Sequence, residues 1–262
     1  MKHVLITGST RGIGFGLAKR FIEAGLKVTI NGTTEINVTR AVRELKELYP
    51  GAIIQGFVAD ICNFKEIEVL WEKATQGFGP VTIWINNAGI DQTRKSIWEI
   101  DSQTIDKVIK TNITGVINGS IIAFTKMAEH GGGQIYNMEG LGSDGMMMKN
   151  MTLYGTTKRA VRYFTRSMSK EAKISSVQIG TLSPGMVVTD FLFNSLKANP
   201  KEAEKNKRIF NILADHVETV TLFLSNKILT NTKSNAHIEW LTKQKVIYRF
   251  LKSLFVKRDL FQ

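Results

Sequence analysis

The chain has 262 residues, of which 43% are hydrophobic, and this is enough to bury one large core. Its formal net charge is +12 and its pI is near 9.7, which favours an anionic cofactor or an anionic lipid surface as a partner. No zinc-finger, RNA-recognition or basic-zipper pattern occurs, so we expect no nucleic-acid partner. The single cysteine, Cys62, excludes an internal disulfide and predicts a reducing, cytoplasmic compartment; it also fits a small buried apolar residue.

The order of the predicted elements indicates an α/β fold. The start of the chain, "MKHVLITG", enters an apolar strand at once, so we expect no signal peptide, and no apolar run is long enough to span a bilayer. Strands are predicted at 3–8, 27–32, 52–60, 81–89, 134–138, 176–185 and, less regularly, 236–241. Helices are predicted between them at 13–24, 36–48, 64–77, 104–128 and 154–173. Strict alternation predicts one domain with a Rossmann-type, doubly wound parallel sheet between two helical layers.

The segment "TGSTRGIG" (7–14) joins the first strand to the first helix. Its glycines let the backbone approach a pyrophosphate, and the helix amino terminus offers free N–H groups. The second strand ends in "NGTT" without the carboxylate that would bind the ribose hydroxyls of NAD. Arg11 and Thr33 are placed to meet a 2′-phosphate instead, so NADP(H) is predicted over NAD(H). The alternative for Arg11 is a solvated surface charge.

Tyr154 and Lys158 stand at positions i and i+4 of a predicted helix, so their side chains share one face. A neighbouring ammonium stabilises a phenolate, which suits the pair to proton transfer near neutral pH. Asn112, in the long helix "KTNITG", is a candidate to hold a water that relays protons, although a structural amide is the simpler interpretation.

These motifs, with "NNAG" (86–89) and "LSPGMVVTD" (182–190), together resemble the short-chain dehydrogenase/reductase family over about residues 1–195. The resemblance implies that Asn112, Tyr154 and Lys158 carry catalysis and that no metal is used. It implies that Asp60 contacts adenine, that Asn86 and its neighbours line the middle of the cofactor, and that Pro184 and the residues after it hold the nicotinamide. The predicted cofactor-binding residues are Gly8, Thr10, Arg11, Gly12, Ile13, Gly14, Thr33, Asp60, Ile61, Asn87, Ala88, Gly89, Tyr154, Lys158, Pro184, Gly185, Val187 and Thr189.

The family's catalytic serine is replaced: its place, after the fifth strand, falls on Gly140. Ser143 is the nearest hydroxyl that could replace it, or it is only a turn residue. The segments "IYNMEGLGSDG", "YGTTKRAV" and "NILAD" resemble the chlorophyll b reductase branch, which has a similar loop and reduces the C7 formyl group of chlorophyll b with NADPH. We therefore expect a reductase of a bulky apolar aldehyde or ketone, with a non-catalytic NADP(H)-binding sensor or scaffold as the alternative.

The last third of the chain is predicted as part of the same domain. Residues 1–190 are expected to form the cofactor-binding core, 190–231 a lid and its following helix, and 232–262 a basic segment. Gly140, Ser143, Met147 and Phe191 are candidate substrate contacts, although core or dimer packing explains "MMMKNM" (146–151) and the Phe191–Phe193 cluster equally well. The final amphipathic stretch fits either contact with a membrane surface or docking on the protein. A homo-oligomer is expected.

Overall fold

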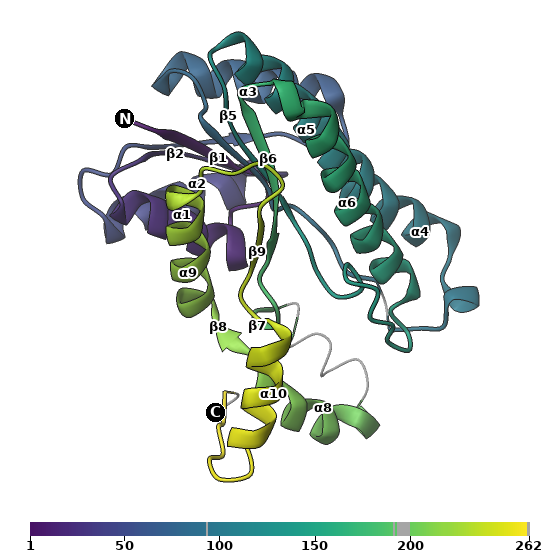
Figure 1. Cartoon of the computed structure of the whole chain (residues 1–262). Helices are drawn as coiled ribbons and strands as arrows, with labels where there is room; N and C mark the ends of the chain where they lie inside the picture. Colours follow the sequence, from purple (N-terminus) through teal and green to yellow (C-terminus); the bar gives the residue numbers. More distant parts are fainter. Residues whose placement is uncertain (93, 191, 193–199, 261–262) are drawn as a thin grey trace.

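A seven-stranded parallel sheet forms the centre of the molecule, with strand order β3-β2-β1-β4-β5-β6-β9 (Figure 1). The computed structural model describes residues 1–92, 94–190, 192 and 200–260. After β1, the chain adds β2 and β3 on one side of β1; it then crosses back and adds β4 on the other side. The direction of strand addition therefore reverses between β1 and β4. Doubly wound folds bind their ligands at such a point. The strands are β1 (His3–Ile6), β2 (Lys27–Gly32), β3 (Ile54–Val58), β4 (Ile83–Asn86), β5 (Gly133–Met138), β6 (Val177–Ser183) and β9 (His237–Glu239).

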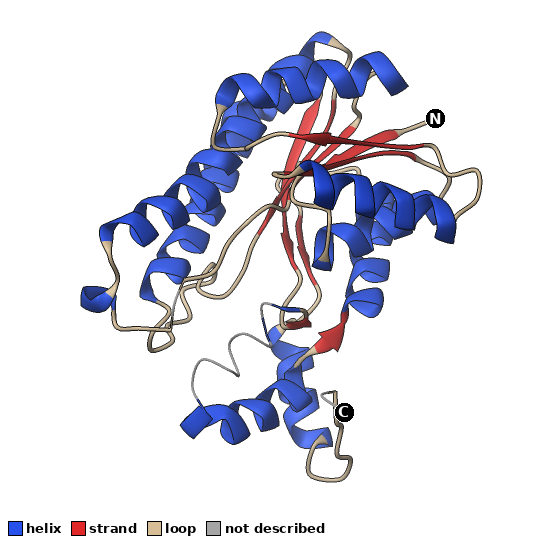
Figure 2. Ribbon diagram, turned by 180° about the vertical axis from the view of Figure 1, so that it is seen from behind, coloured by secondary structure: helices blue, strands red, loops and turns tan. Residues whose placement is uncertain are grey.

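Helices cover both faces of this sheet, which confirms the predicted three-layer α/β/α fold (Figure 2). On one face lie α1 (Gly12–Glu23), α2 (Glu35–Leu48) and α9 (Val217–Thr230), packed on apolar residues that include Phe21, Val28 and Leu224. On the other face lie α3 (Phe64–Phe78), α5 (Gly115–Glu129) and α6 (Thr152–Glu171). The central strands β1 and β4 are buried on both sides, which explains why their sequences read as continuous apolar runs.

The long helix predicted over 104–128 is interrupted in its hydrogen bonding. It consists of α4 (Ser102–Ile109), a π-helical turn (Lys110–Thr114) and α5. A π-turn inserts one extra residue into a helix and often marks a functional site. Asn112 lies in this turn and is fully buried, so the distortion faces the interior of the protein.

Below the carboxyl ends of the strands, parts of the last third of the chain form a lower region (Figure 1). It contains α8 (Pro200–Leu213), α10 (Lys243–Lys252) and a two-stranded sheet of β7 (Val187–Val188) and β8 (Asp215–His216). Short 3₁₀ turns lie elsewhere, at Ile97–Glu99 and Ala172–Ile174. The sequence pattern did not predict β7 and β8, since each has only two residues and carries no periodicity.

The predicted seventh strand is β9, which pairs with β6 although it comes from the basic C-terminal segment. Asp215 then ties the chain after β9 to the lower region. Its carboxylate accepts a hydrogen bond from Trp240 Nε1 at 2.7 Å and forms ion pairs with Arg249 at 2.6 Å and Arg258 at 3.0 Å. The C-terminal segment is therefore docked on the domain, as one of the two sequence interpretations requires.

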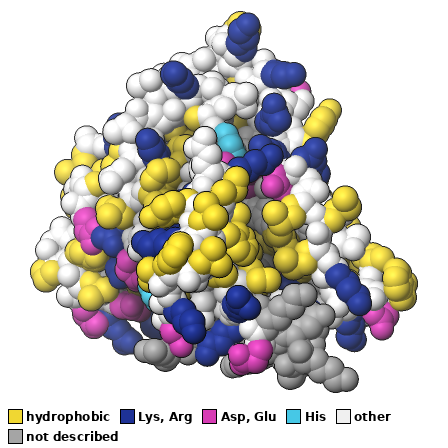
Figure 3. Space-filling model, turned by 60° about the horizontal axis from the view of Figure 1, so that its bottom comes forward, with side chains coloured by type: hydrophobic (Ala, Val, Ile, Leu, Met, Phe, Trp, Pro, Cys, Tyr) yellow, Lys and Arg dark blue, Asp and Glu magenta, His cyan; other side chains and the backbone are white. Residues whose placement is uncertain are grey.

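Docking leaves one side of α10 and the following turn uncovered. Apolar side chains gather with lysines and arginines on the face at the bottom of Figure 1, as Figure 3 shows. No helix in the described part of the chain is both long enough and apolar enough to cross a bilayer. The exposed apolar side chains of this C-terminal face are Ile247, Tyr248, Phe250, Leu251, Leu254, Phe255 and Val256.

Candidate active site

The glycine loop after β1 forms the first wall of a long cleft at the carboxyl ends of the strands. Gly8 has φ +58° and lies so close to Ala88 that any Cβ would overlap it. Gly12 has φ +59° and opens toward the cleft, because a Cβ there would meet only Thr189, at 3.8 Å. Arg11 caps α1 without a side-chain hydrogen bond, so the N–H groups at the helix start are available to an anion. This cradle fits the pyrophosphate of a dinucleotide.

Hydrogen bonds hold the glycine loop to the segment that follows β4, at the point where the strand order reverses. The Thr7 hydroxyl accepts hydrogen bonds from the backbone N–H groups of Asn87 and Ala88, both at 3.1 Å. The Asn87 amide donates to the Thr7 and Gly8 carbonyls at 2.9 Å. Asn87, Ala88 and Gly89 line the cleft as expected, but Asn86 does not. Asn86 is buried behind it, where its amide donates to Asn137 Oδ1 at 2.7 Å, so it holds β4 to β5.

At the end of β2 the cleft is bordered by cations and hydroxyls. Thr33 and Arg11 both line it, as does Asp60, which the resemblance assigns to adenine. Arg11 is exposed and stands 3.6 Å from Asp190. Sequence reasoning missed Arg40, which lines the same end of the cleft from the first turns of α2. Arg40 lies in α2, far along the sequence from the glycine motif, and no local pattern marks it as a site residue.

The cleft is also lined by Pro184, Gly185, Val187 and Thr189, the residues that the resemblance assigns to the nicotinamide. Thr10, Gly12 and Ile13 line it from the glycine loop, and Ile61 does so from the segment after β3. Gly14 lies behind this surface, because a Cβ there would overlap the Asn87 side chain. Nearly all of the predicted cofactor residues therefore border one continuous cleft.

Tyr154 and Lys158 project from one face of α6 into this cleft. Both are buried, and the Lys158 ammonium nitrogen lies 5.7 Å from the centre of the Tyr154 ring. Burial raises the pKa of Tyr154, and the Asp91 carboxylate adds to that increase. Burial lowers the pKa of Lys158 to about 8, against which the Glu139 charge acts. Without a bound ligand, both groups therefore favour their uncharged forms more than they would in water.

The Asn112 side chain makes hydrogen bonds with the backbone of Ile90. Its Oδ1 accepts from the Ile90 N–H at 2.8 Å and its Nδ2 donates to the Ile90 carbonyl at 2.9 Å. Nδ2 also donates to the Thr157 hydroxyl at 3.1 Å. The amide thus fixes the loop after β4 against α6, which is a structural role beside the catalytic pair; a role in proton relay stays a prediction.

Gly140 lies against the hydroxyl of Tyr154. A Cβ at position 140 would overlap that oxygen and would come within 3.2 Å of Tyr154 Cζ and 3.3 Å of Lys158 Cγ. The place of the family serine is therefore closed by the tyrosine itself. Glycine at this position lets the phenol lie directly on the loop.

Ser143 is buried and its hydroxyl donates to Glu139 Oε2 at 3.1 Å. Its carbonyl accepts from Arg159 Nη1 at 3.0 Å, which fixes the loop on α6. The hydroxyl proton of Ser143 is thus used within the protein. Sequence reasoning did not identify Glu139, Arg162 or His237 as site residues, although all three line the cleft.

Asp91, Gln92 and Arg94 form the wall on the other side of Tyr154. Asp91 and Arg94 are an ion pair at 2.7 Å, and the Gln92 side-chain oxygen accepts from the Tyr154 backbone N–H at 2.6 Å. Burial raises the pKa of Asp91, with Arg94 opposing it. The motif "NNAG" predicted only the first residues of this loop. The residues that follow it carry no pattern from which these contacts could have been predicted.

Methionines border the cleft at the loop before α6. Met146, Met148 and Met151 line it, whereas Met147 is 95% exposed and is not among the lining residues. Phe191 lies outside the described residues. Leu192 and Phe210 line the cleft from the lower region, and Val246 and Ile247 line it from α10, giving it an apolar entrance.

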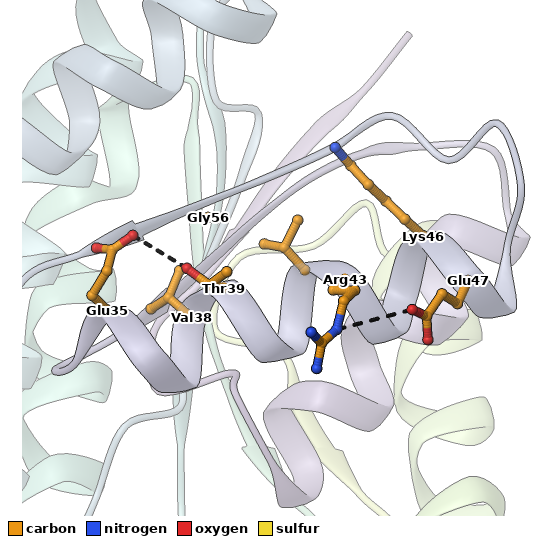
Figure 4. A pocket seen from close by; sticks show the side chains of 8 residues that line it. Glu35, Val38, Thr39, Arg43, Lys46, Glu47 and Gly56 are labelled. Carbon is orange, nitrogen blue, oxygen red and sulfur yellow. Dashed lines mark hydrogen bonds and ion pairs between the residues drawn. The ribbon is translucent and has the colours of Figure 1, made fainter.

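A second hollow lies on the outer surface between α2 and β3 (Figure 4). Its charged side chains are engaged locally: Thr39 donates to Glu35 at 3.2 Å, and Arg43 stands 3.9 Å from Glu47. It contains no acid–base pair of the kind found in the main cleft. Within the described residues, no group of three or more His, Cys, Asp or Glu side chains is placed to hold a metal.

Comparison with known proteins places this geometry in a family. Residues 2–200 match the family model described as short chain dehydrogenase. The probable chloroplastic chlorophyll(ide) b reductase NYC1 of Arabidopsis thaliana is 32% identical over 96% of this chain and 53% of its own length. The chloroplastic chlorophyll(ide) b reductase NOL of Oryza sativa subsp. japonica is 34% identical over 96% of this chain and 75% of its own length. The chain thus spans about half the length of the first of these relatives.

A third relative is the 3alpha-hydroxysteroid dehydrogenase of Mediterraneibacter gnavus, 34% identical over 73% of this chain and 76% of its own length. Among solved structures, levodione reductase superposes with a TM-score of 0.84 at 24% identity, covering 94% of this chain and 98% of that one. The 3-ketoacyl-(acyl-carrier-protein) reductase of Brucella melitensis complexed with NADH superposes with a TM-score of 0.81 at 22% identity, covering 93% and 98%. These structures support the Rossmann fold. The chain belongs to the short-chain dehydrogenase family and is an oxidoreductase enzyme with chlorophyll(ide) b reductases among its relatives.

Proposed function

We propose that this enzyme uses NADPH to reduce the carbonyl group of a bulky apolar aldehyde or ketone, with the C7 formyl group of chlorophyll b or chlorophyllide b as the leading candidate. The observation that carries the proposal is the Tyr154–Lys158 pair in a cleft where Gly140 stands at the serine position and the Tyr154 hydroxyl fills the space of a side chain there. The apolar entrance and the names of the relatives support the choice of substrate. A non-catalytic sensor is not favoured, because a binding protein has no use for a buried acid–base pair.

In the proposed reaction the bound cofactor supplies a hydride to the carbonyl carbon. Tyr154 donates its phenolic proton to the carbonyl oxygen, so that one aldehyde or ketone becomes one alcohol. The proton leaves a phenolate on Tyr154, which the Lys158 ammonium stabilises by charge. Because Lys158 is buried with a pKa near 8, the ammonium form is present at neutral pH and is lost in mildly alkaline solution.

We infer that this site does not need the usual serine. A tyrosine hydroxyl that lies on the Gly140 backbone is held in position by packing on α6 and by the loop. A large planar substrate is oriented by burial of its apolar surface, at about 25 cal/mol per Å² before the entropic costs of binding. Orientation by a serine hydroxyl is then less important than it is for a small substrate.

The preference for NADPH is part of the proposal. The end of β2 carries Thr33 and no carboxylate, and Arg11 and Arg40 border the same end of the cleft. A 2′-phosphate carries up to two negative charges, and guanidinium groups bind such an oxyanion through paired hydrogen bonds. The end of β2 itself offers the ribose hydroxyls of NADH no carboxylate.

We also propose that the enzyme meets its substrate at a membrane surface in a reducing compartment such as the cytoplasm, and that it acts as a homo-oligomer. The exposed apolar face of α10 adjoins the apolar entrance through Ile247, which belongs to both. Lys243, Lys252 and Lys257 are exposed in the same segment and would favour anionic lipid. A substrate dissolved in lipid would then enter directly.

The experiment is incubation of the purified protein with NADPH and chlorophyllide b, followed by chromatography for the 7-hydroxymethyl product. A 3-keto steroid and a small aldehyde serve as comparison substrates, because one relative is a hydroxysteroid dehydrogenase. Formation of the 7-hydroxymethyl product, absent in Tyr154→Phe, supports the proposal. Rapid turnover of only the steroid or the small aldehyde rejects the chlorophyll substrate and leaves the reductase assignment.

A further inference from the structure

Glu139 is a carboxylate buried at the end of β5, directly before Gly140. Its side chain is 0% exposed, and a charge in such a position is costly unless it is paired. Ser143 donates to Oε2 at 3.1 Å, and Arg162 Nη1 stands 3.6 Å from the same oxygen. The other oxygen, Oε1, accepts no hydrogen bond from any residue that the structure describes. The Oε1 atom of this carboxylate can therefore interact with a neighbouring positive charge in the cleft.

Lys158, on α6, reaches the backbone of the loop that carries Glu139. Lys158 is buried, and its Nζ donates to the carbonyl of Met138, the residue before Glu139, at 3.2 Å. Arg162 follows Lys158 by one helical turn on α6, so both cations face the loop that carries the carboxylate. Glu139 is also the charged group that acts on Lys158 against the effect of burial.

We propose that Glu139 is a positioning residue of this site, whose buried carboxylate holds the Lys158 side chain as an ammonium beside Tyr154. The inference rests on the proposed reductase reaction but applies to any carbonyl substrate. It gives a physical role to the carboxylate that directly precedes Gly140, the residue at the serine position. The charge acts through Lys158 and does not touch the substrate.

Several other charged and titratable groups surround the carboxylate. From α6 come Lys158 and Arg162, with Arg159 holding the Ser143 carbonyl. From β9 comes His237, whose Nδ1 stands 3.8 Å from Oε1 and is hydrogen-bonded to the Thr181 hydroxyl at 2.8 Å. Glu239 stands 3.8 Å from the other His237 nitrogen.

The decisive variant is Glu139→Gln, which keeps the shape and removes the charge. Reduction requires the Lys158 ammonium, so kcat falls as pH rises through its pKa. Without the Glu139 charge this alkaline limb should move to lower pH by about one unit or more, which is a change of about tenfold in the proton affinity of Lys158. Glu139→Asp retains a charge and should keep the limb closer to its original position. Glu171→Gln, which removes one exposed charge at the end of the same helix, should leave it unchanged.

A second measurement makes the test independent of turnover. The Lys158 side chain, labelled with ¹³C and assigned by its absence in Lys158→Met, is titrated by NMR in the protein without cofactor or substrate. A lower titration midpoint in Glu139→Gln than in the parent and in Glu171→Gln supports the inference. Unchanged midpoints with an unchanged alkaline limb would overturn it and leave Glu139 as a structural residue. If no carbonyl compound is reduced by the parent protein, the proposed function fails while this titration still decides the role of Glu139.

Discussion

The two ends of the cleft are built in different ways. At the phosphate end, backbone groups of Gly8 and Gly12 and the start of α1 form the binding surface, and all of them lie within one short segment. At the carbonyl end, the surface consists of side chains from β5, α6 and β9, which are far apart in the sequence. The phosphate end therefore tolerates few changes of backbone, whereas the carbonyl end is sensitive to charge and to side-chain volume.

The largest effect expected at the carbonyl end follows the loss of the phenolic hydroxyl. Tyr154→Phe should lower kcat by about 10²–10⁴-fold, because the phenol is the proposed proton donor and phenylalanine has no proton to give. Affinity for NADPH, measured by titration calorimetry, should change little. Tyr163→Phe removes a hydroxyl that is exposed on the same helix and is the matched control. A Tyr154→Phe enzyme with nearly parental turnover would show that the two ends of the cleft do not divide binding from chemistry in this way.

A smaller but still large effect is expected for Gly140→Ser, which restores the family residue. The new Cβ would overlap the Tyr154 hydroxyl, and a displacement of about 1 Å at a reacting group costs roughly 10²-fold in rate. The catalytic efficiency should therefore fall, with cofactor affinity preserved. In Gly155→Ala the added Cβ finds its nearest neighbours at 3.8 Å, so this control should retain activity. A gain of activity in Gly140→Ser would mean that the missing hydroxyl is a defect.

Removing a positive charge at the phosphate end should change only the relative affinities for NADPH and NADH. NADPH should bind at least about tenfold more tightly than NADH, a difference of about 1.4 kcal/mol. Arg11→Ala should remove much of that difference, although the exposure of Arg11 limits its contribution. Arg43→Ala is the control and should leave both affinities unchanged, because Arg43 lies on the same helix as Arg40 but does not line the cleft. Equal affinities of the parent for the two cofactors would refute the preference.

The smallest effect concerns the surface beyond the carbonyl end. The double variant Leu254→Ser and Phe255→Ser should weaken binding to vesicles containing anionic lipid by about three- to tenfold, because both side chains are exposed and apolar. Ile174→Ser, which removes a fully exposed apolar side chain next to α6, is the control. Sedimentation with vesicles measures the difference. Loss of binding in the control alone would move the contact to another face.

The sequence predicts the features that depend on neighbouring residues and misses those that depend on contacts between distant elements. The glycine loop and the Tyr154–Lys158 pair are local patterns, since backbone turns and i,i+4 neighbours are fixed by short spacings. The predicted strands and helices agree with the structure to within a few residues because buried parallel strands leave continuous apolar runs. The surroundings of Glu139 depend on α6 and β9 and have no local signature. Sequence reasoning also placed Asn86 on the cleft, although it donates to Asn137 behind it.

Asp215 has a consequence for how the molecule opens. One buried carboxylate is shared by Arg249, Arg258 and the Trp240 indole, which belong to successive parts of the C-terminal segment. These contacts cannot be lost one at a time without leaving a guanidinium group or the carboxylate poorly compensated. The backbone amides of α10 and β8 should therefore exchange with deuterium together, as one cooperative unit, while the amides of β1 and β4 exchange only on global unfolding.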